Sequence, residues 1–149
     1  MIGPGTGIAP MRALLQERDH QRRVQKLNVG QNVLYFGCKN RVDDFIYSDE
    51  LNQYEKDGIL NEMHLAFSRE QDEKVYVQHL LQKNAKRTWE MINEGGAYVY
   101  VCGGVKMGQD VSETIRKIVA QYGDRSTTDA KKYVEEMTSN GRFVQELWA

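Results

Sequence analysis

The stretch MIGPGTGIAP at residues 1–10 decides the fold class, because it joins two apolar residues to a glycine-rich bend and then to a helical pattern. Met1 and Ile2 are expected to form the tail of a first strand, and this strand is cut short because only two residues precede Gly3. Pro10 suits the first turn of the helix that follows. The segment therefore predicts a strand, a tight loop and a helix, in that order.

The glycine-rich loop is suited to holding a phosphate. Glycines allow backbone N–H groups to approach an anion, and the amino end of the following helix adds a favourable dipole. The loop is no Walker loop, which would end in GK[ST], and it does not fit GxGxxG because Ile8 or Pro10 occupies the third glycine position. On these residues alone an ordinary tight turn remains an alternative. The candidate residues are Gly3, Gly5 and Gly7.

Further along the chain, apolar runs alternate with helical stripes. Continuous runs at residues 32–38 and 97–102 are typical of parallel strands buried on both faces. Shorter strands are expected at residues 63–67 and 142–147, each after a turn signal. Three helical stripes of core residues lie between and around them: Met11, Leu14 and Leu15; Val111, Ile115, Ile118, Val119 and Tyr122; and Ala130, Tyr133, Val134 and Met137.

This alternation predicts an α/β fold, namely a doubly wound three-layer sandwich with a mostly parallel sheet. Ligands of such folds bind at the carboxyl ends of the strands. The loops that follow the strands are therefore where binding residues are expected.

Composition narrows the function classes. The 149 residues suit one domain, and 20 basic against 21 acidic side chains give no overall field that would attract nucleic acid or an anionic membrane. No apolar run approaches the roughly 20 residues of a membrane span. Cys38 and Cys102 lack CxxC spacing and suit a reduced compartment, and the three histidines show no metal-ligand spacing. An intracellular, cytoplasmic protein without a metal site is expected.

A second informative stretch, SREQDEKVYVQ at residues 68–78, directly follows the third run. Arg69 can bind phosphate through a planar fork and Lys74 as a point charge, while Ser68 offers a hydroxyl and Tyr76 an aromatic face. A solvated charged loop is the alternative, because the stretch also carries acids. At a carboxyl strand end, an arginine near the ribose accommodates a 2′-phosphate, which favours NADP over NAD.

Taken in order, GPGTGIAP, QER, FGC, DDFIY, AFSRE, KVYVQ, YVCG and a terminal aromatic resemble the NADPH-binding domain of the diflavin reductases, which is ferredoxin-reductase-like in fold. The resemblance covers essentially the whole chain. It implies that residues 1–149 are a single NADP(H)-binding domain and the carboxyl-terminal fragment of a larger FAD/FMN reductase.

The resemblance also implies roles for matching positions. It places Thr6 and the glycine loop on the pyrophosphate, and Cys102 beside the nicotinamide. Trp148 would stack on the flavin, and Glu146 would be the acid near the carboxyl terminus. The implied catalytic set is Cys102, Glu146 and Trp148. The remaining implied cofactor-binding positions are Ser68, Arg69, Lys74 and Tyr76 on the 2′-phosphate and adenosine, with Gln78 nearby, and Cys38, Lys39, Gly103 and Trp148.

Three departures from the family pattern stand out. Glu146 replaces an aspartate and is one methylene longer. After YVCG, Gly104 stands where an acid is usual, and the segment VKMGQD that follows is nearer to nitric-oxide synthase reductase domains. Lys39 stands where a relative would have arginine, which keeps the charge but loses the planar fork.

The implied activity is hydride transfer from NADPH to FAD, followed by electron transfer through FMN to a haem-protein acceptor, as in enzymes of the cytochrome P-450 reductase type. The FAD and flavodoxin domains would belong to the same polypeptide, and a membrane anchor, if any, would be an absent amino-terminal one on the cytosolic face of the endoplasmic reticulum. The fragment alone is expected to bind NADP without turnover. The alternatives are the reductase part of a nitric-oxide synthase, a sulfite reductase flavoprotein or a pyruvate:NADP oxidoreductase, and a non-catalytic NADP-binding module.

Overall fold

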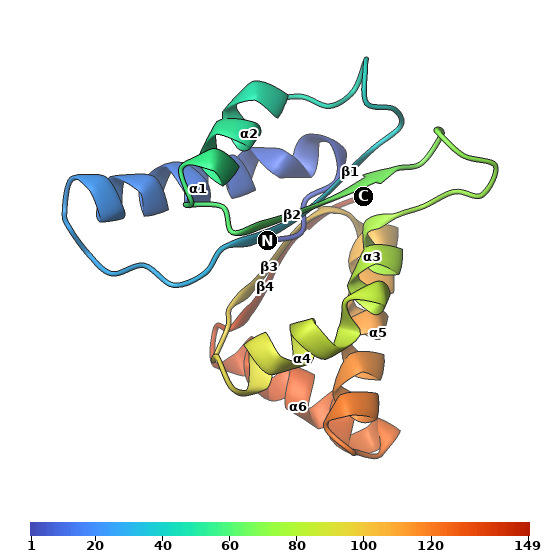
Figure 1. The fold of residues 1–149 in the computed structure, drawn as a ribbon. Helices are drawn as coiled ribbons and strands as arrows, with labels where there is room; N and C mark the ends of the chain where they lie inside the picture. Colours follow the sequence, from blue (N-terminus) through green and yellow to red (C-terminus); the bar gives the residue numbers. More distant parts are fainter. The chain divides into compact units, whose positions relative to one another are not determined.

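The computed structural model describes every residue from Met1 to Ala149, and the chain forms two compact units, Met1–Tyr76 and Val77–Ala149. Each unit has one pair of parallel strands and its own helices (Figure 1). The elements, in chain order, are η1 Gly5–Gly7, α1 Ile8–Arg23, β1 Val33–Cys38, α2 Ser48–Lys56, β2 Glu62–Phe67, α3 Val77–Lys83, α4 Ala85–Asn93, β3 Val99–Gly104, α5 Val105–Tyr122, α6 Thr127–Ser139 and β4 Phe143–Trp148.

In the first unit, β1 and β2 pair in parallel, from Val33 opposite Glu62 to Cys38 opposite Phe67. The start of the chain runs alongside them. Ile2 forms a parallel bridge with Tyr35, and the Tyr35 N–H donates to the Met1 carbonyl at 2.9 Å. The predicted first strand is therefore present as a short extended segment beside β1.

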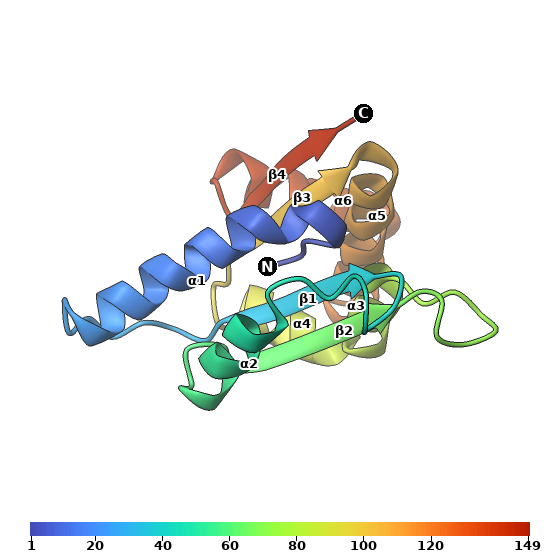
Figure 2. The ribbon, with the colours of Figure 1, turned by 90° about the horizontal axis from the view of Figure 1, so that it is seen from above.

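Helices α1 and α2 lie on the same side of the β1–β2 pair (Figures 1 and 2). Helix α1 turns Ile8, Met11 and Leu15 inward, and β1 contributes the fully buried Leu34 and Phe36. Burying each of these side chains stabilises the fold by roughly 1.5–3 kcal/mol. The predicted helix after the glycine loop is confirmed, with Pro10 in its first turn, where the missing N–H costs no helical hydrogen bond.

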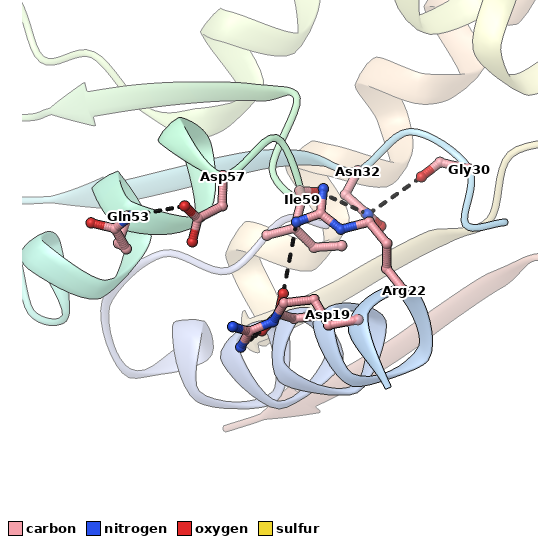
Figure 3. A network of polar contacts seen from close by, with 8 residues as sticks. Asp19, Arg22, Gly30, Asn32, Gln53, Asp57 and Ile59 are labelled. Carbon is pink, nitrogen blue, oxygen red and sulfur yellow. Dashed lines mark hydrogen bonds and ion pairs between the residues drawn. The ribbon is translucent and has the colours of Figure 1, made fainter. Parts of the chain in front are cut away.

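A polar network closes the opposite end of this unit, near the amino ends of β1 and β2 (Figure 3). The Asn32 side chain donates to the Ile59 carbonyl at 2.9 Å, and the Asn32 N–H donates to Asn61 Oδ1 at 2.8 Å. On α1, Asp19 is only 6% exposed and is paired with Arg23 and, at 3.8 Å, with Arg22. The Asn32 bonds fix where the two strands begin, and the Asp19 pairs stabilise the last turns of α1.

In the second unit, β3 and β4 pair in parallel, from Val99 opposite Phe143 to Gly104 opposite Trp148. Helices α3, α4, α5 and α6 lie on one side of this pair (Figure 1). The predicted stripe on α5 is confirmed at four positions that are fully buried: Val111, Ile115, Ile118 and Val119. Tyr122 was predicted to continue the stripe, which is wrong, because it is 39% exposed at the last turn, where the helix passes beyond the core.

The predicted α/β class with parallel strands is confirmed, although the strand at residues 97–102 is observed two residues later. Tyr98 is exposed, and the Ala97 N–H donates to the Met91 carbonyl, so both belong to the turn after α4. None of the helices combines the length and the apolar composition needed to cross a membrane.

Candidate functional site

The carboxyl ends of three parallel segments in the first unit form one edge, and the predicted phosphate-binding loops follow these ends. The Gly3 N–H donates to the Tyr35 carbonyl at 3.0 Å as the chain leaves the first segment. The Ser68 and Arg69 N–H groups donate to the Cys38 and Lys39 carbonyls, both at 2.9 Å. Because all three segments run in the same direction, the glycine loop and Arg69 lie at the same edge of this unit.

The glycine loop has a shape that side chains would prevent. A Cβ at Gly3 would lie 2.3 Å from the Gly7 carbonyl oxygen, and Gly5 has a φ of +56°. Such a φ is disfavoured for most residues with side chains. No acidic side chain stands in the first turn of α1, and no side chain caps its start at Gly7. The Ile8 N–H that begins α1 already donates to the Gly5 and Thr6 carbonyls, and Pro10 has no N–H, so this loop offers an anion mainly the positive end of the helix dipole, with exposed Thr6 beside it.

Three cations of the loops after β1 and β2 have no acidic partners. Lys39, Arg69 and Lys74 are exposed, and none of them forms a salt bridge. The neighbouring acid Glu70 instead accepts a hydrogen bond from the Arg41 backbone N–H at 2.6 Å. The loops after β1 and β2 carry five acidic side chains against four basic ones, so recognition of a phosphate there would depend on these individual cations and not on a net positive charge.

The other predicted residues of this unit differ in exposure. Ser68 is half-buried at the end of β2, and Tyr76 is exposed at the end of the same loop. The Cys38 thiol donates to the Asn40 carbonyl at 3.3 Å. Its burial, with smaller contributions from the Asp44 and Glu70 charges, raises the pKa of Cys38 to about 11. Cys38 is therefore a neutral side chain at physiological pH, suited to packing and not to nucleophilic attack.

The predicted redox residues lie at the carboxyl ends of β3 and β4 in the second unit. Cys102 is the register partner of Glu146, and Gly104 is the partner of Trp148. Cys102 is 7% exposed, and its burial, followed by the negative charge of Glu146, raises the pKa of the thiol. Trp148 is 45% exposed, so a face of its indole is open for stacking.

Gln78, predicted to lie near the adenosine, is the second residue of α3 in the second unit. Its side-chain oxygen is buried and accepts no hydrogen bond. A buried acceptor without a donor is costly, and a ligand hydroxyl or amino group would satisfy it.

Each unit thus gathers its own share of the predicted residues. The first unit holds Gly3, Gly5, Thr6, Gly7, Cys38, Lys39, Ser68, Arg69, Lys74 and Tyr76, and the second holds Gln78, Cys102, Gly103, Glu146 and Trp148. No group of three or more His, Cys, Asp or Glu side chains is placed to hold a metal ion.

One residue of this edge was missed from the sequence. Arg41 lies in the loop after β1, and its guanidinium stacks over the Phe67 ring at 4.5 Å while its N–H binds Glu70. Arg41 therefore connects the loop after β1 to the end of β2 and the start of the loop that follows it. Arg41 lies two residues before the DDFIY motif begins, and no local sequence pattern indicated this contact.

Comparison with known proteins agrees with this geometry. The family model described as "Oxidoreductase NAD-binding domain" matches residues 1–113 and so extends through the first unit into the second. The chain belongs to the oxidoreductase NAD-binding domain family.

Members of this family that resemble the chain include reductases that are several times longer. The NADPH–cytochrome P450 reductase of Rattus norvegicus is 45% identical over 150 aligned residues, which span 100% of this chain and 22% of the rat protein. The corresponding enzymes of Salmo trutta and Dictyostelium discoideum are 43% and 40% identical, and the match covers 25% and 22% of their lengths. The predicted diflavin-reductase resemblance is confirmed, and the other diflavin enzymes are not favoured.

Proposed function

We propose that residues 1–149 form a single NADP(H)-binding domain of a larger electron-transfer flavoprotein of the cytochrome P450 reductase type. Homology to reductases of this name over the whole chain supports the class. The chain spans only about a quarter or less of these relatives, so the FAD and FMN domains are assigned to the rest of the polypeptide.

The glycine loop would hold the pyrophosphate. The Gly3, Gly7 and Ile8 N–H groups are bonded within the protein, so the remaining loop N–H groups would act as donors, the start of α1 would add a positive dipole, and Thr6 would add a hydroxyl. Support comes from the glycine geometry: the close approach of Gly3 to Gly7 and the positive φ of Gly5 allow a tight bend that side chains would prevent, and a Cβ at Gly5 would meet only open space.

Arg69 and Lys74 would bind the 2′-phosphate, with Ser68 as a hydroxyl donor and Tyr76 stacked on the adenine. The hydrogen bond from the Arg69 N–H to the Lys39 carbonyl is the single observation that carries this assignment, because it brings a second cation to the same edge. Two cations without acidic partners favour the dianionic 2′-phosphate of NADP over the neutral 2′-hydroxyl of NAD.

The second unit would hold the redox end of the cofactor. Bound NADPH supplies a hydride to a flavin. Cys102 would pack as a neutral thiol against the nicotinamide and Glu146 would stabilise positive charge that develops there, while Gln78 would accept a hydrogen bond from the adenosine. The exposed indole of Trp148 would cover the flavin until the nicotinamide replaces it.

In the complete protein, electrons would pass from FAD through FMN to a haem-protein acceptor, on the cytosolic face of the endoplasmic reticulum. The isolated chain carries no flavin-binding domain in this proposal, so it should bind NADP without reducing a cytochrome. Reduction of cytochrome c by the purified, flavin-free chain and NADPH would contradict this part of the proposal.

The nucleotide assignment is tested by calorimetric titration of the 149-residue chain with 2′-AMP and with 5′-AMP. We expect 2′-AMP to bind more tightly, because only it places a phosphate against Arg69 and Lys74. Higher ionic strength should weaken 2′-AMP binding more than 5′-AMP binding. Equal affinities for the two nucleotides would refute the preference for NADP.

A further inference from the structure

Helix α5 contacts the face of β4 that lies opposite the Glu146 and Trp148 side chains. Because side chains alternate along a strand, Gln145 and Leu147 point to the face opposite Glu146 and Trp148. The Gln145 amide donates to the Ser112 hydroxyl of α5 at 2.6 Å. Leu147 packs against Gly108, one turn earlier on the same helix. Two contacts therefore connect the end of β4 to α5.

Gly108 is the more constrained of these residues. It lies inside α5, where a glycine costs about 1 kcal/mol relative to alanine. A Cβ at this position would lie 2.5 Å from Leu147 Cδ1 and 2.6 Å from Cδ2. The glycine thus allows the helix and the strand to approach closely, and any side chain there would push Leu147 away.

A polar hollow of ≈ 460 Å³ adjoins these contacts. It is lined by Gln109, Asp110, Ser112, Glu113, Arg116, Gln145 and Leu147. Open space on this side means that Gln145 and Leu147 lack the all-round packing of core residues. The hydrogen bond to Ser112 and the contact with Gly108 therefore carry much of the restraint on this part of β4.

We propose that Gly108 and Ser112 are positioning residues, which hold Leu147 and Gln145 against α5 and thereby fix Glu146 beside Cys102. The inference rests on the proposed function in assigning Cys102 and Glu146 to the redox end. It adds the residues that set the relative placement of the thiol and the carboxylate.

The test measures how strongly Glu146 acts on Cys102, without any cofactor. In a Cys38→Ser background of the full 149-residue chain, the rate of Cys102 alkylation by iodoacetamide as a function of pH gives the pKa of the thiol. The effect of Glu146→Gln on this pKa is measured in the parent and again with Gly108→Ala or Ser112→Ala. We expect Glu146→Gln to lower the pKa in the parent, and its effect to fall by roughly half or more with Gly108→Ala and less with Ser112→Ala.

A compensating variant separates positioning from general damage. Gly108→Ala combined with Leu147→Val shortens the side chain that the new Cβ meets, so the effect of Glu146→Gln should return toward the parent value. Ser139→Ala is the matched control, because it also removes a helical hydroxyl of this unit, on α6. It should leave the coupling unchanged.

An effect of Glu146→Gln that is the same in every background would overturn the proposal. So would an effect that is zero in the parent, and this result would leave the binding of 2′-AMP intact as a separate finding. If circular dichroism shows that Gly108→Ala does not fold, the Ser112→Ala variant alone decides the test. An unchanged effect of Glu146→Gln on the pKa of Cys102 in that variant would then count against the proposal, and a smaller effect would support it.

Discussion

Cys102 lies directly opposite Glu146 in the parallel ladder of β3 and β4, so an almost fully buried thiol has a carboxylate residue as its neighbour. Burial disfavours the thiolate, and the negative charge of Glu146 disfavours it further. Both causes act in the same direction. The thiol is thereby kept neutral, which suits a residue that packs against a cofactor and does not attack it.

The two cysteines should both react slowly with alkylating reagents near neutral pH. The pKa is raised to about 11 at Cys38 and is also raised at Cys102, and only the thiolate is reactive. Iodoacetamide kinetics followed by intact mass from pH 7 to pH 10 should show rates that are still rising at pH 9. The urea-unfolded chain provides the control and should react faster at each pH. Fast modification of the folded chain at pH 7 would contradict the raised pKa values.

Replacing Arg69 with alanine should weaken the binding of 2′-AMP by roughly 1.5–3 kcal/mol, the scale of a hydrogen bond to a charged group. The affinity for 5′-AMP should change much less, because that nucleotide has no 2′-phosphate. Calorimetry on both nucleotides gives the comparison. Arg18→Ala is a suitable control, since Arg18 is an exposed arginine of α1 whose side chain bonds only weakly to Gln21, at 3.4 Å. Parallel losses for the two nucleotides would argue against contact with the 2′-phosphate.

Gly3→Ala should destabilise the fold by about 1–3 kcal/mol, because the new Cβ would lie 2.3 Å from the Gly7 carbonyl oxygen and the backbone must shift. Gly30→Ala is a matched control, since a Cβ there meets nothing within 4 Å. Urea unfolding followed by circular dichroism measures both free energies of unfolding. Equal stability of the two variants would show that the loop can accommodate a Cβ at position 3 without strain.

When the 149-residue chain is studied alone, so that Met1 carries a free amino group, its stability should depend on pH through that group. Burial lowers the pKa of this group from 8.0 to about 5, and the group donates to the Val33 carbonyl at 2.9 Å. Between pH 5 and pH 8 the unfolded chain therefore binds a proton that the folded chain does not, so the free energy of unfolding should rise with pH across this window. Urea titrations at four pH values measure the slope.

A variant with one residue added before Met1 converts this amine into an amide, which still has an N–H but does not titrate. Its slope between pH 5 and pH 8 should be smaller than that of the parent. Identical slopes in the two chains would assign the pH dependence to other groups.

Strands β1 and β3 were predictable because they are continuous apolar runs, as is typical of buried parallel strands, and β2 and β4 were predictable because each follows a turn signal. The start of β3 was misplaced because Tyr98 is apolar in composition yet exposed, and its end was missed because Gly103 and Gly104 pair through their backbone alone. The short helices α2, α3 and α4 were not predicted, since seven to nine residues of mixed charge give little periodicity.

The loops after β1 and β2 were predictable for a topological reason, since they follow parallel strands. The contacts between β4 and α5 were not predictable from the sequence. The hydrogen bond between Ser112 and Gln145 joins residues 33 positions apart and depends on the register of β4 against β3, which no local pattern specifies. Gly108, three residues before the predicted stripe begins at Val111, was the one available signal, because glycine is disfavoured inside a helix unless something packs closely against it.

The hydrogen bond between Glu70 and the Arg41 N–H has an electrostatic consequence for the edge that holds Arg69. The Glu70 carboxylate is adjacent in sequence to Arg69 and would repel a dianion if its side chain turned toward the ligand. Here it accepts a hydrogen bond from a backbone N–H of the neighbouring loop. The attraction that a phosphate experiences is therefore greater than the near balance of acids and bases along residues 68–74 suggests. Removal of the Glu70 carboxylate would free the loop after β1 at the same time as it raised the local positive potential, so affinity and order at this edge would change in opposite directions.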